Sequence, residues 1–446
     1  MRRTILFLMT IMPLFICAQN TIYFMDRLPQ NISYNPAFIP NVKFYLGLPG
    51  IGGISANAYN SGFNYDGIKG FTDNYGNSGY NPDEFVKSIG DNNRFTAETK
   101  ENIFSMGFKL KEKGYFSFGL TMNSLVSLKT GSGIAYFLAD KDKISHADFP
   151  IRVDDVDFLA NNYLTMSFTY SRKLNEQLTI GISPNINFNI AGIKAKGVSY
   201  IINLKNPQSS KREYDETFFG DLVLGLPVEI NPVAIAGGKL DSDQNFLRDN
   251  WGDDVSISDL LKNKSLSLNL GATYSLEQWV FSASILNIGA SSWKNNGYRF
   301  IGDNEITLVS EVPKIKIGIP TKIYIAANRQ FTPKWNYGLV LNNTFYYSGS
   351  NASATLSLNG GVGRMLSTSF SYTAGYKFNN IGWGIRLRFF PGTDLYFVTD
   401  NITQLLNYKS AYRVSAAFGI NLAFGVKQFS SSVKESEEDP EKLIKN

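Results

Sequence analysis

The chain has 446 residues and is rich in glycine (39), phenylalanine (33) and tyrosine (24), whereas histidine and cysteine occur once each. Charged residues make up 18% of it, below the roughly 25% of an ordinary soluble domain, and the net charge of +5 is spread without a block of Lys and Arg. This composition argues against nucleic acid as a partner and against a disulfide scaffold, and its length allows one large β architecture.

Residues 1–18 have the layout of a secretory signal peptide. Two arginines precede an apolar run, and the small Ala18 offers a cleavage site that leaves Gln19 as the first residue of the mature chain. Acylation of Cys17, as in a lipoprotein, is the alternative, but the bulky Ile16 stands where the lipoprotein peptidase requires a small residue. Cleavage after Ala18 leaves a mature chain without a thiol.

Residues 19–41 form a separate segment before the first regular pattern. Its stretch LPQNISYNPAFIP (28–40) contains three prolines. Proline has no amide donor and pushes the preceding residue toward extended conformations, so neither a helix nor a central strand is expected here.

From residue 42 to residue 427 the dominant signal is a period of two. In 178–190 and 266–274, apolar side chains alternate with Ser, Thr, Asn and Gly, and aromatic residues often stand at the ends of the apolar face. Such segments run to about ten residues, near the roughly 9–11 that a tilted strand needs to cross a bilayer. The pattern favours a transmembrane antiparallel β-barrel over a secreted sandwich, with outer-membrane lipid around it.

Connections between the alternating segments differ in length. Six short turns are predicted at 111–114, 173–177, 275–278, 329–334, 363–366 and 390–393. With a first strand in 42–59 and a last one in 412–426, they give about fourteen strands; sixteen is the alternative, because 192–263 has room for another hairpin. Short turns on the periplasmic side and long extracellular loops then place both termini in the periplasm of a Gram-negative bacterium.

Two further segments have distinct compositions. DDVSISDLLKNK (253–264) predicts a short amphipathic helix over the mouth of the barrel or inside it. Residues 428–446 are charged and too poor in apolar side chains to pack, so we expect a periplasmic tail.

The sequence contains few residues that could form a catalytic or metal-binding site. The single His146 lies in a predicted long loop, and Asp154, Asp155 and Asp157 lack the spacing of a calcium loop, so we interpret all four as solvated. We expect no enzyme activity, no metal and no cofactor.

Five basic residues fall on the polar face of their predicted strands. They are Lys316, Lys377, Arg386, Arg388 and Arg413. Inward-facing cations either form internal ion pairs with acids or attract an anionic solute, and the ion pairs are the favoured interpretation.

Tyr34-Asn35-Pro36-Ala37 resembles the NPA element near the amino terminus of FadL-like outer-membrane channels, in which an N-terminal hatch folds inside a fourteen-stranded barrel. Similar elements open PorV and the PorP/SprF proteins of Bacteroidota type IX secretion. Together with DLYFVTDNI (394–402), the opening resembles the latter group and a related Bacteroidota barrel family of unassigned function, which we place first. The resemblance implies a luminal plug centred on Asn35, Pro36, Ala37 and Phe38.

Two functions follow from the barrel and its resemblance. The first is a passive channel for a small apolar or amphipathic solute, as in FadL-like proteins. The alternative is a structural or assembly component of a type IX secretion, gliding or surface-protein complex. Strand pattern reports the surrounding solvent and not the cargo, so the sequence leaves both open.

Overall fold

The computed structural model describes residues 19–75, 77, 81–90, 92–111, 113–138, 149–205, 214–225, 262–294, 297–303, 305–311, 314–362, 365–375, 378–390 and 392–425. The predicted helix at 253–264 lies almost entirely outside these ranges, and so do His146 and the charged tail.

Strands account for most of the described elements. The strands are β1 (Phe44–Gly47), β2 (Ile54–Asn60), β3 (Asn93–Leu110), β4 (Gly114–Thr130), β5 (Ile151–Lys173), β6 (Leu178–Leu204), β7 (Tyr214–Gly225), β8 (Lys264–Leu276), β9 (Trp279–Trp293), β10 (Gly297–Asp303), β11 (Glu305–Glu311), β12 (Ile315–Gly318), β13 (Thr321–Thr332), β14 (Trp335–Tyr346), β15 (Gly349–Val362), β16 (Leu366–Gly375), β17 (Phe378–Phe390), β18 (Thr393–Thr399) and β19 (Arg413–Phe424). The helices are α2 (Gln19–Tyr23), η2 (Pro29–Ser33), α3 (Tyr65–Asn74), α4 (Asp83–Ile89), α5 (Ile134–Leu138), α9 (Ile402–Leu406) and η5 (Tyr408–Ser410).

Fourteen strands close into an antiparallel barrel, as the sequence predicts. The ring runs through β2, β3, β4, β5, β6, β8, β9, β13, β14, β15, β16, β17, β18 and β19, which pairs back with β2. Each of the six predicted turns joins two strands that pair with each other. Closure leaves no free edge in the ring, so the backbone amides and carbonyls of its strands find partners within lipid.

The first strand of the ring is interrupted. The short β1 pairs with β3 and β19 below the point where β2 pairs with the same two strands, so β1 and β2 are two pieces of one strand. A comparable break separates β12 from β13, which both pair with β9.

The two faces of the wall follow the predicted alternation. Outward positions carry large apolar side chains at high exposure, as in Leu266 (74%), Ile325 (58%) and Leu356 (58%). Inward positions carry buried small polar groups such as Ser183, Asn185 and Asn187. An apolar outer surface of this extent is unfavourable in water and favourable in a bilayer, so the barrel has the solvent preference of an outer-membrane protein.

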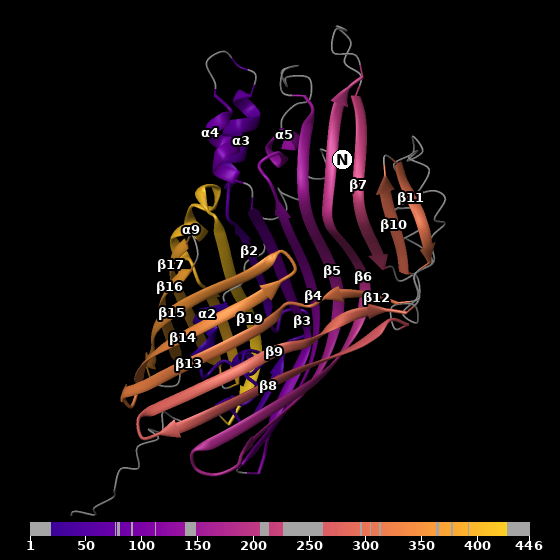
Figure 1. Ribbon diagram of the computed structural model, residues 1–446. Coiled ribbons are helices and arrows are strands. Elements are labelled where there is room, and N and C mark those ends of the chain that lie inside the picture. Colours follow the sequence, from indigo (N-terminus) through magenta and orange to yellow (C-terminus); the bar gives the residue numbers. More distant parts are fainter. Residues whose placement is uncertain are drawn as a thin grey trace, which may run out of the picture.

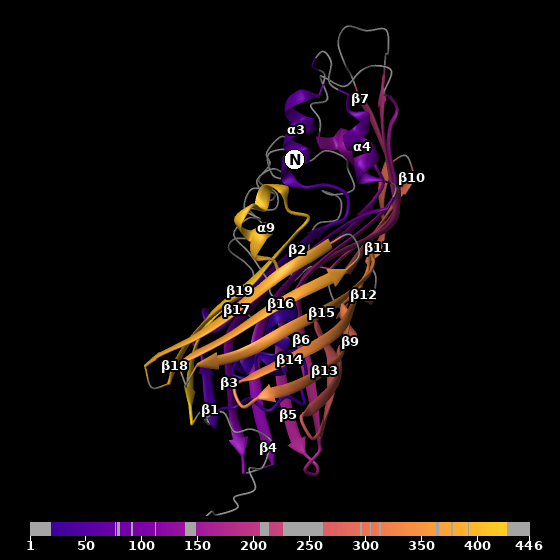
Figure 2. The same ribbon diagram turned by 90° about the vertical axis from the view of Figure 1, so that its left-hand side faces the viewer.

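The two ends of the barrel differ, as Figures 1 and 2 show. The six hairpin turns lie at one end, here called the hairpin end. Helices α3, α4, α5 and α9 lie at the other, here called the long-loop end. No helix in the described ranges has the length and hydrophobicity to cross a bilayer.

The alternative of sixteen strands is wrong for the ring. The region after β6 does hold further strands, but β7, β10 and β11 form a side sheet that joins the wall where β7 pairs with the upper half of β6. The lower half of β6 pairs with β8 and keeps the ring at fourteen strands.

Candidate functional site

The N-terminal segment (residues 19–41) lies against inward-facing groups of the wall. The Asn35 amide donates hydrogen bonds to the carbonyls of Ala272 (3.4 Å) and Ala283 (3.2 Å), on β8 and β9. The Ser171 hydroxyl on β5 donates to the Pro36 carbonyl at 2.5 Å. The Asn35-Pro36-Ala37 turn therefore has partners on three strands of the wall.

Two glycines in the wall make room for this turn. A Cβ at Gly181 on β6 would lie 2.1 Å from the Pro36 carbonyl carbon and oxygen, and one at Gly271 on β8 would lie 2.0 Å from the Asn35 Oδ1. Both distances are far below van der Waals contact, so only glycine allows the turn to sit this close. The Asn35 Oδ1 also accepts a hydrogen bond from the Ala37 amide at 2.9 Å, which fixes the turn locally.

Aromatic side chains fasten the same segment to a second part of the wall. The Tyr23 ring stacks on Tyr324 of β13 with centroids 5.3 Å apart, and Phe38 meets Tyr23 edge-on at 5.1 Å. Tyr23 and Phe24 pack with buried residues of β9, β13 and β14, and the half-buried Phe38 lies against this cluster. These contacts bury apolar surface that an extended, undocked segment would expose to water.

Two pairs of side chains cross the lumen. The Lys322 ammonium on β13 donates to the Glu98 carboxylate on β3 at 2.7 Å, and both side chains are almost fully buried. The Ser127 hydroxyl on β4 and the Ser348 hydroxyl beyond β14 are 2.7 Å apart. We call these four residues the luminal bridge. In each pair the strands lie on opposite sides of the ring, so the bridge ties two walls together.

Apolar packing narrows the lumen near the bridge. Leu125 and Leu159 of β4 and β5 pack against Trp293, Ile315 and Ile317 of β9 and β12, and all five side chains are buried. The inside of this barrel is therefore packed at this level and does not form a wide aqueous channel.

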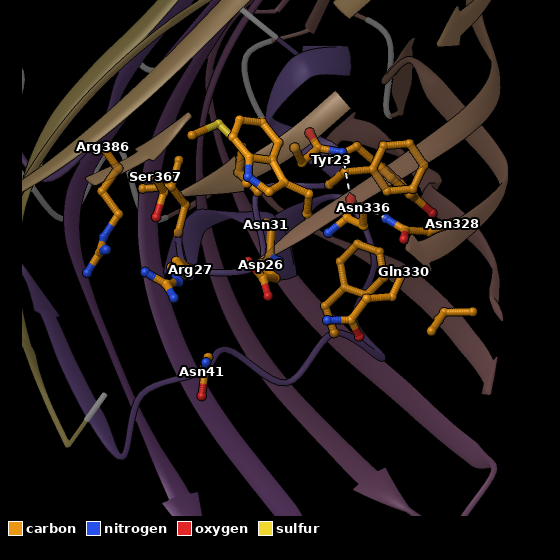
Figure 3. Close-up of a pocket in the computed structure, with 18 of the residues that line it drawn as sticks. Tyr23, Asp26, Arg27, Asn31, Asn41, Asn328, Gln330, Asn336, Ser367 and Arg386 are labelled. Atoms are coloured by element: carbon orange, nitrogen blue, oxygen red, sulfur yellow. Dashed lines mark hydrogen bonds between the residues drawn. The ribbon is translucent and has the colours of Figure 1, made fainter. Parts of the chain in front are cut away.

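A cavity of about 280 Å³ opens at the hairpin end between the N-terminal segment and the wall. Figure 3 shows Asp26, Arg27 and Asn31 of the segment between Arg386 on one side and Asn336 on the other. Its aromatic lining consists of Tyr23, Phe24, Phe38 and Trp335, and its charged lining consists of Asp26, Arg27, Lys334 and Arg386. Aromatic walls with a few polar groups are the usual lining of a small-molecule site.

The charged groups of the segment influence one another in this cavity. Asp26 keeps part of its surface exposed to water, but the surrounding protein desolvates its carboxyl group. Desolvation raises the pKa of this carboxyl, and the positive charges of Arg27 and Arg386 oppose the rise. Burial lowers the pKa of the Arg27 guanidinium, and Asp26 opposes that shift. The hairpin-end cavity therefore holds a carboxyl group whose protonation responds to its surroundings.

A second cavity of about 460 Å³ lies at the long-loop end. Its lining includes Tyr59, Arg94, Thr96 and Tyr346. Thr96 is two residues from Glu98 on β3, so this cavity ends beside the luminal bridge. The bridge and the N-terminal segment thus stand between one cavity at each end of the barrel.

Two of the five predicted luminal cations meet the same acid. The Arg386 guanidinium, with 0% exposure, contacts both carboxylate oxygens of Asp394 at 2.8 Å, and Arg388 contacts them at 2.6 and 2.8 Å. Three charges held in this way on adjacent strands form an internal ion cluster.

The other three cations lie elsewhere. Arg413 is buried on β19. Lys316 is exposed, contrary to expectation, because at the long-loop end the apolar Ile315 and Ile317 turn inward to pack with Trp293. Lys377 lies outside the described residues. Asp155, one of the three acids of the 154–157 stretch, pairs with Lys129 at 2.6 Å. No cluster of metal ligands occurs in the part of the chain that the structure describes.

Sequence reasoning missed the luminal bridge and the acids Asp26 and Asp394. Glu98 and Lys322 stand on the polar face of their strands, so alternation marks them as inward, but their sequence separation of 224 residues carries no sign of their pairing. Asp394 begins the DLYFVTDNI stretch, which the resemblance singled out for another reason.

Several solved structures resemble this chain in fold over most of their length. The toluene transporter TodX of Pseudomonas putida matches at 10% identity and a TM-score of 0.41, covering 89% of this chain and 92% of that one. A Pseudomonas aeruginosa FadL homologue matches at 10% identity and a TM-score of 0.43, covering 92% and 96%. The CymD monoaromatic hydrocarbon channel matches at 10% identity and a TM-score of 0.41, covering 89% and 92%.

Sequence comparison gives a family but no activity. Among curated proteins no sequence matches the chain. The model of a family of unknown function, DUF5723, matches residues 36–311 and 302–400, which include the Pro36-Ala37 turn and nearly the whole ring. The chain is therefore a member of the DUF5723 family.

Proposed function

We propose that this protein is a passive outer-membrane channel for a small apolar or amphipathic solute, with the N-terminal segment as its plug. The observation that carries the proposal is the hairpin-end cavity, which combines an aromatic lining with charged groups from the segment itself. Its volume of about 280 Å³ is near the lower end of the usual range for small-molecule sites, roughly 300–1,000 Å³, and suits a solute of one or two rings.

The arrangement along the barrel axis supports this proposal. A solute that enters at the long-loop end meets the larger cavity, then the luminal bridge and the plug, and then the hairpin-end cavity. Passage requires the plug to move or the bridge to part, because side chains fill the lumen between the cavities. Residues 1–18 act in this proposal as a removable leader, and both termini lie in the periplasm.

Uptake and binding of 1-naphthol, a small aromatic alcohol, test the proposal. Vesicles that contain the protein should take up 1-naphthol faster than protein-free vesicles, and deletion of residues 28–40 should raise leakage of small polar solutes as well. In detergent, Trp335→Ala should weaken 1-naphthol binding several-fold, because Trp335 lines the cavity.

Trp279→Ala is the matched control. Trp279 lies at the same end but stacks on the exposed Phe281 of the outer face, so this variant should bind as the wild type does. Uptake equal to that of protein-free vesicles, together with unchanged leakage in the deletion variant, would overturn the channel proposal.

An assembly role in a type IX secretion or surface-protein complex is the second candidate. The side sheet of β7, β10 and β11 favours it, since within the described residues β11 pairs with β10 alone and offers a strand edge at the long-loop end. Purification in mild detergent separates the two candidates. Stoichiometric protein partners support assembly, and a co-purifying apolar molecule supports transport.

A further inference from the structure

The start of helix α2 is held by a buried carboxylate. Asp400, directly after β18, is 1% exposed. Its Oδ2 accepts a hydrogen bond from the Asn20 amide at 3.2 Å, and its Oδ1 accepts from the Thr21 amide at 2.9 Å and the Thr21 hydroxyl at 2.7 Å. Asn20 and Thr21 are buried as well, so the contact lies inside the barrel.

Small residues of the barrel wall around Asp400 leave room for Thr21 and Met25 of the N-terminal segment. A Cβ at Gly382 would lie 2.6 Å from the Thr21 hydroxyl, and one at Gly384 would lie 2.7 Å from the Met25 sulfur. The Ser371 hydroxyl is 2.7 Å from that of Thr21. We call Asp400, Ser371, Gly382 and Gly384 the N-terminal socket, since all four shape the space for the first residues of the segment.

Leader removal would create a charge at this socket. Hydrolysis of the Ala18–Gln19 peptide bond consumes one water and leaves a carboxylate on Ala18 and an amino group on Gln19, which takes up a proton at neutral pH. That nitrogen belongs to the residue directly before Asn20, whose amide already donates to Asp400.

We propose that Asp400 binds the α-ammonium group of the mature N-terminus, so that the plug docks fully only after the leader has been removed. The inference rests on the leader and plug of the proposed function. A buried carboxylate is stabilised by an opposite charge at hydrogen-bond range, and an uncleaved chain places a neutral peptide N–H at the same point.

The reactivity of the mature α-amino group tests this proposal. The full chain, exported with its own leader and purified from outer membranes, should begin at Gln19 by intact mass. Its α-amine should then be labelled with an amine-reactive reagent across a range of pH. An ordinary α-amine titrates near pH 7.7–8.0, and an opposite charge within about 4–6 Å raises that midpoint by a unit or more. At pH 7 we therefore expect labelling about tenfold slower than in the urea-unfolded chain.

Asp400→Asn decides whether the carboxylate causes this protection. The asparagine keeps one oxygen acceptor, for the Thr21 amide and hydroxyl, but places an NH2 group toward Asn20 and removes the charge. The midpoint should therefore return to the ordinary range, and labelling at pH 7 should rise about tenfold. Asp154→Asn, at an exposed position of β5, should change neither. Heat-modifiable migration on gels shows that each variant is folded.

A mature chain extended by one alanine gives a second, independent variant. It moves the ammonium about 3.8 Å along the chain and should label as Asp400→Asn does. An N-terminus acylated at Cys17, cyclised at Gln19 with loss of ammonia, or equally reactive in the wild type and Asp400→Asn would overturn the proposal. Labelling does not depend on any solute, so a failed uptake assay with slow labelling would leave this inference intact.

Discussion

Gly181→Ala should dislodge the N-terminal segment, the plug of the proposed function, without altering the barrel. The added Cβ would lie 2.1 Å from the Pro36 carbonyl group and 2.4 Å from the Ala37 nitrogen, all backbone atoms that cannot rotate away. Restoring ordinary contact requires the turn to move by more than about 1 Å. That shift breaks the 2.5 Å hydrogen bond from Ser171 to Pro36.

The size of the effect follows from these contacts. Overpacking costs about 1–3 kcal/mol, and a lost hydrogen bond costs about 1 kcal/mol. We therefore expect docking to weaken by about 2–4 kcal/mol, which lowers the ratio of docked to undocked plug by about 30-fold to 700-fold. Leakage of a small solute from reconstituted vesicles should rise accordingly, and trypsin should cleave after Arg27, which is buried in the docked segment.

Gly119→Ala supplies the matched control for this prediction. Gly119 lies in β4 of the same wall, and an added Cβ there meets no atom within 4 Å. It makes the same chemical change without touching the plug, and its leakage should equal that of the wild type. If Gly181→Ala leaks and resists trypsin just as Gly119→Ala does, the argument that Gly181 positions the plug is refuted.

Three further predictions concern charged side chains inside the barrel. Lys322→Met should destabilise the barrel by about 3–5 kcal/mol, because Glu98 is left buried without its cross-lumen partner, and adding Glu98→Gln should recover much of that loss in a double-mutant cycle of urea unfolding. Asp394→Asn should also lower the urea midpoint of unfolding, since it removes the carboxylate that Arg386 and Arg388 share. An unchanged midpoint would show that this ion cluster adds no stability. Because desolvation raises the pKa of Asp26, its protonation favours the docked plug, so solute leakage should increase as pH rises through that raised pKa, and Asp26→Asn should abolish this dependence.

Local rules made most of the ring predictable from sequence. Side chains alternate across a strand with a period of two, so segments such as 178–190 are recognisable as strands with an apolar outward face, although β6 continues beyond this segment to Leu204. Turn residues at 275–278 and 329–334 then mark the hairpins that join paired strands. Alternation and turn composition are each visible within a few consecutive residues, so both can be recognised in a single sequence.

Contacts across the lumen could not be predicted from the sequence, because they join residues that are far apart along the chain. Nothing local links Glu98 to Lys322 or Asn20 to Asp400, because the closed ring alone brings these residues together. The exposed Lys316 shows a different limit. Alternation identifies two faces, but at the long-loop end packing against Trp293 reverses which face is inward.

The interrupted first strand has a consequence for how the barrel is made. The last strand, β19, must pair with β18 on one side and with both β1 and β2 on the other, across sequence separations that span nearly the whole mature chain. Contacts of such long range form late, after the cost of closing a very large loop has been met. The barrel therefore closes where β19 pairs with two short strands, β1 and β2, in place of one long strand. The chain can complete the barrel only after β19 has been synthesised and exported.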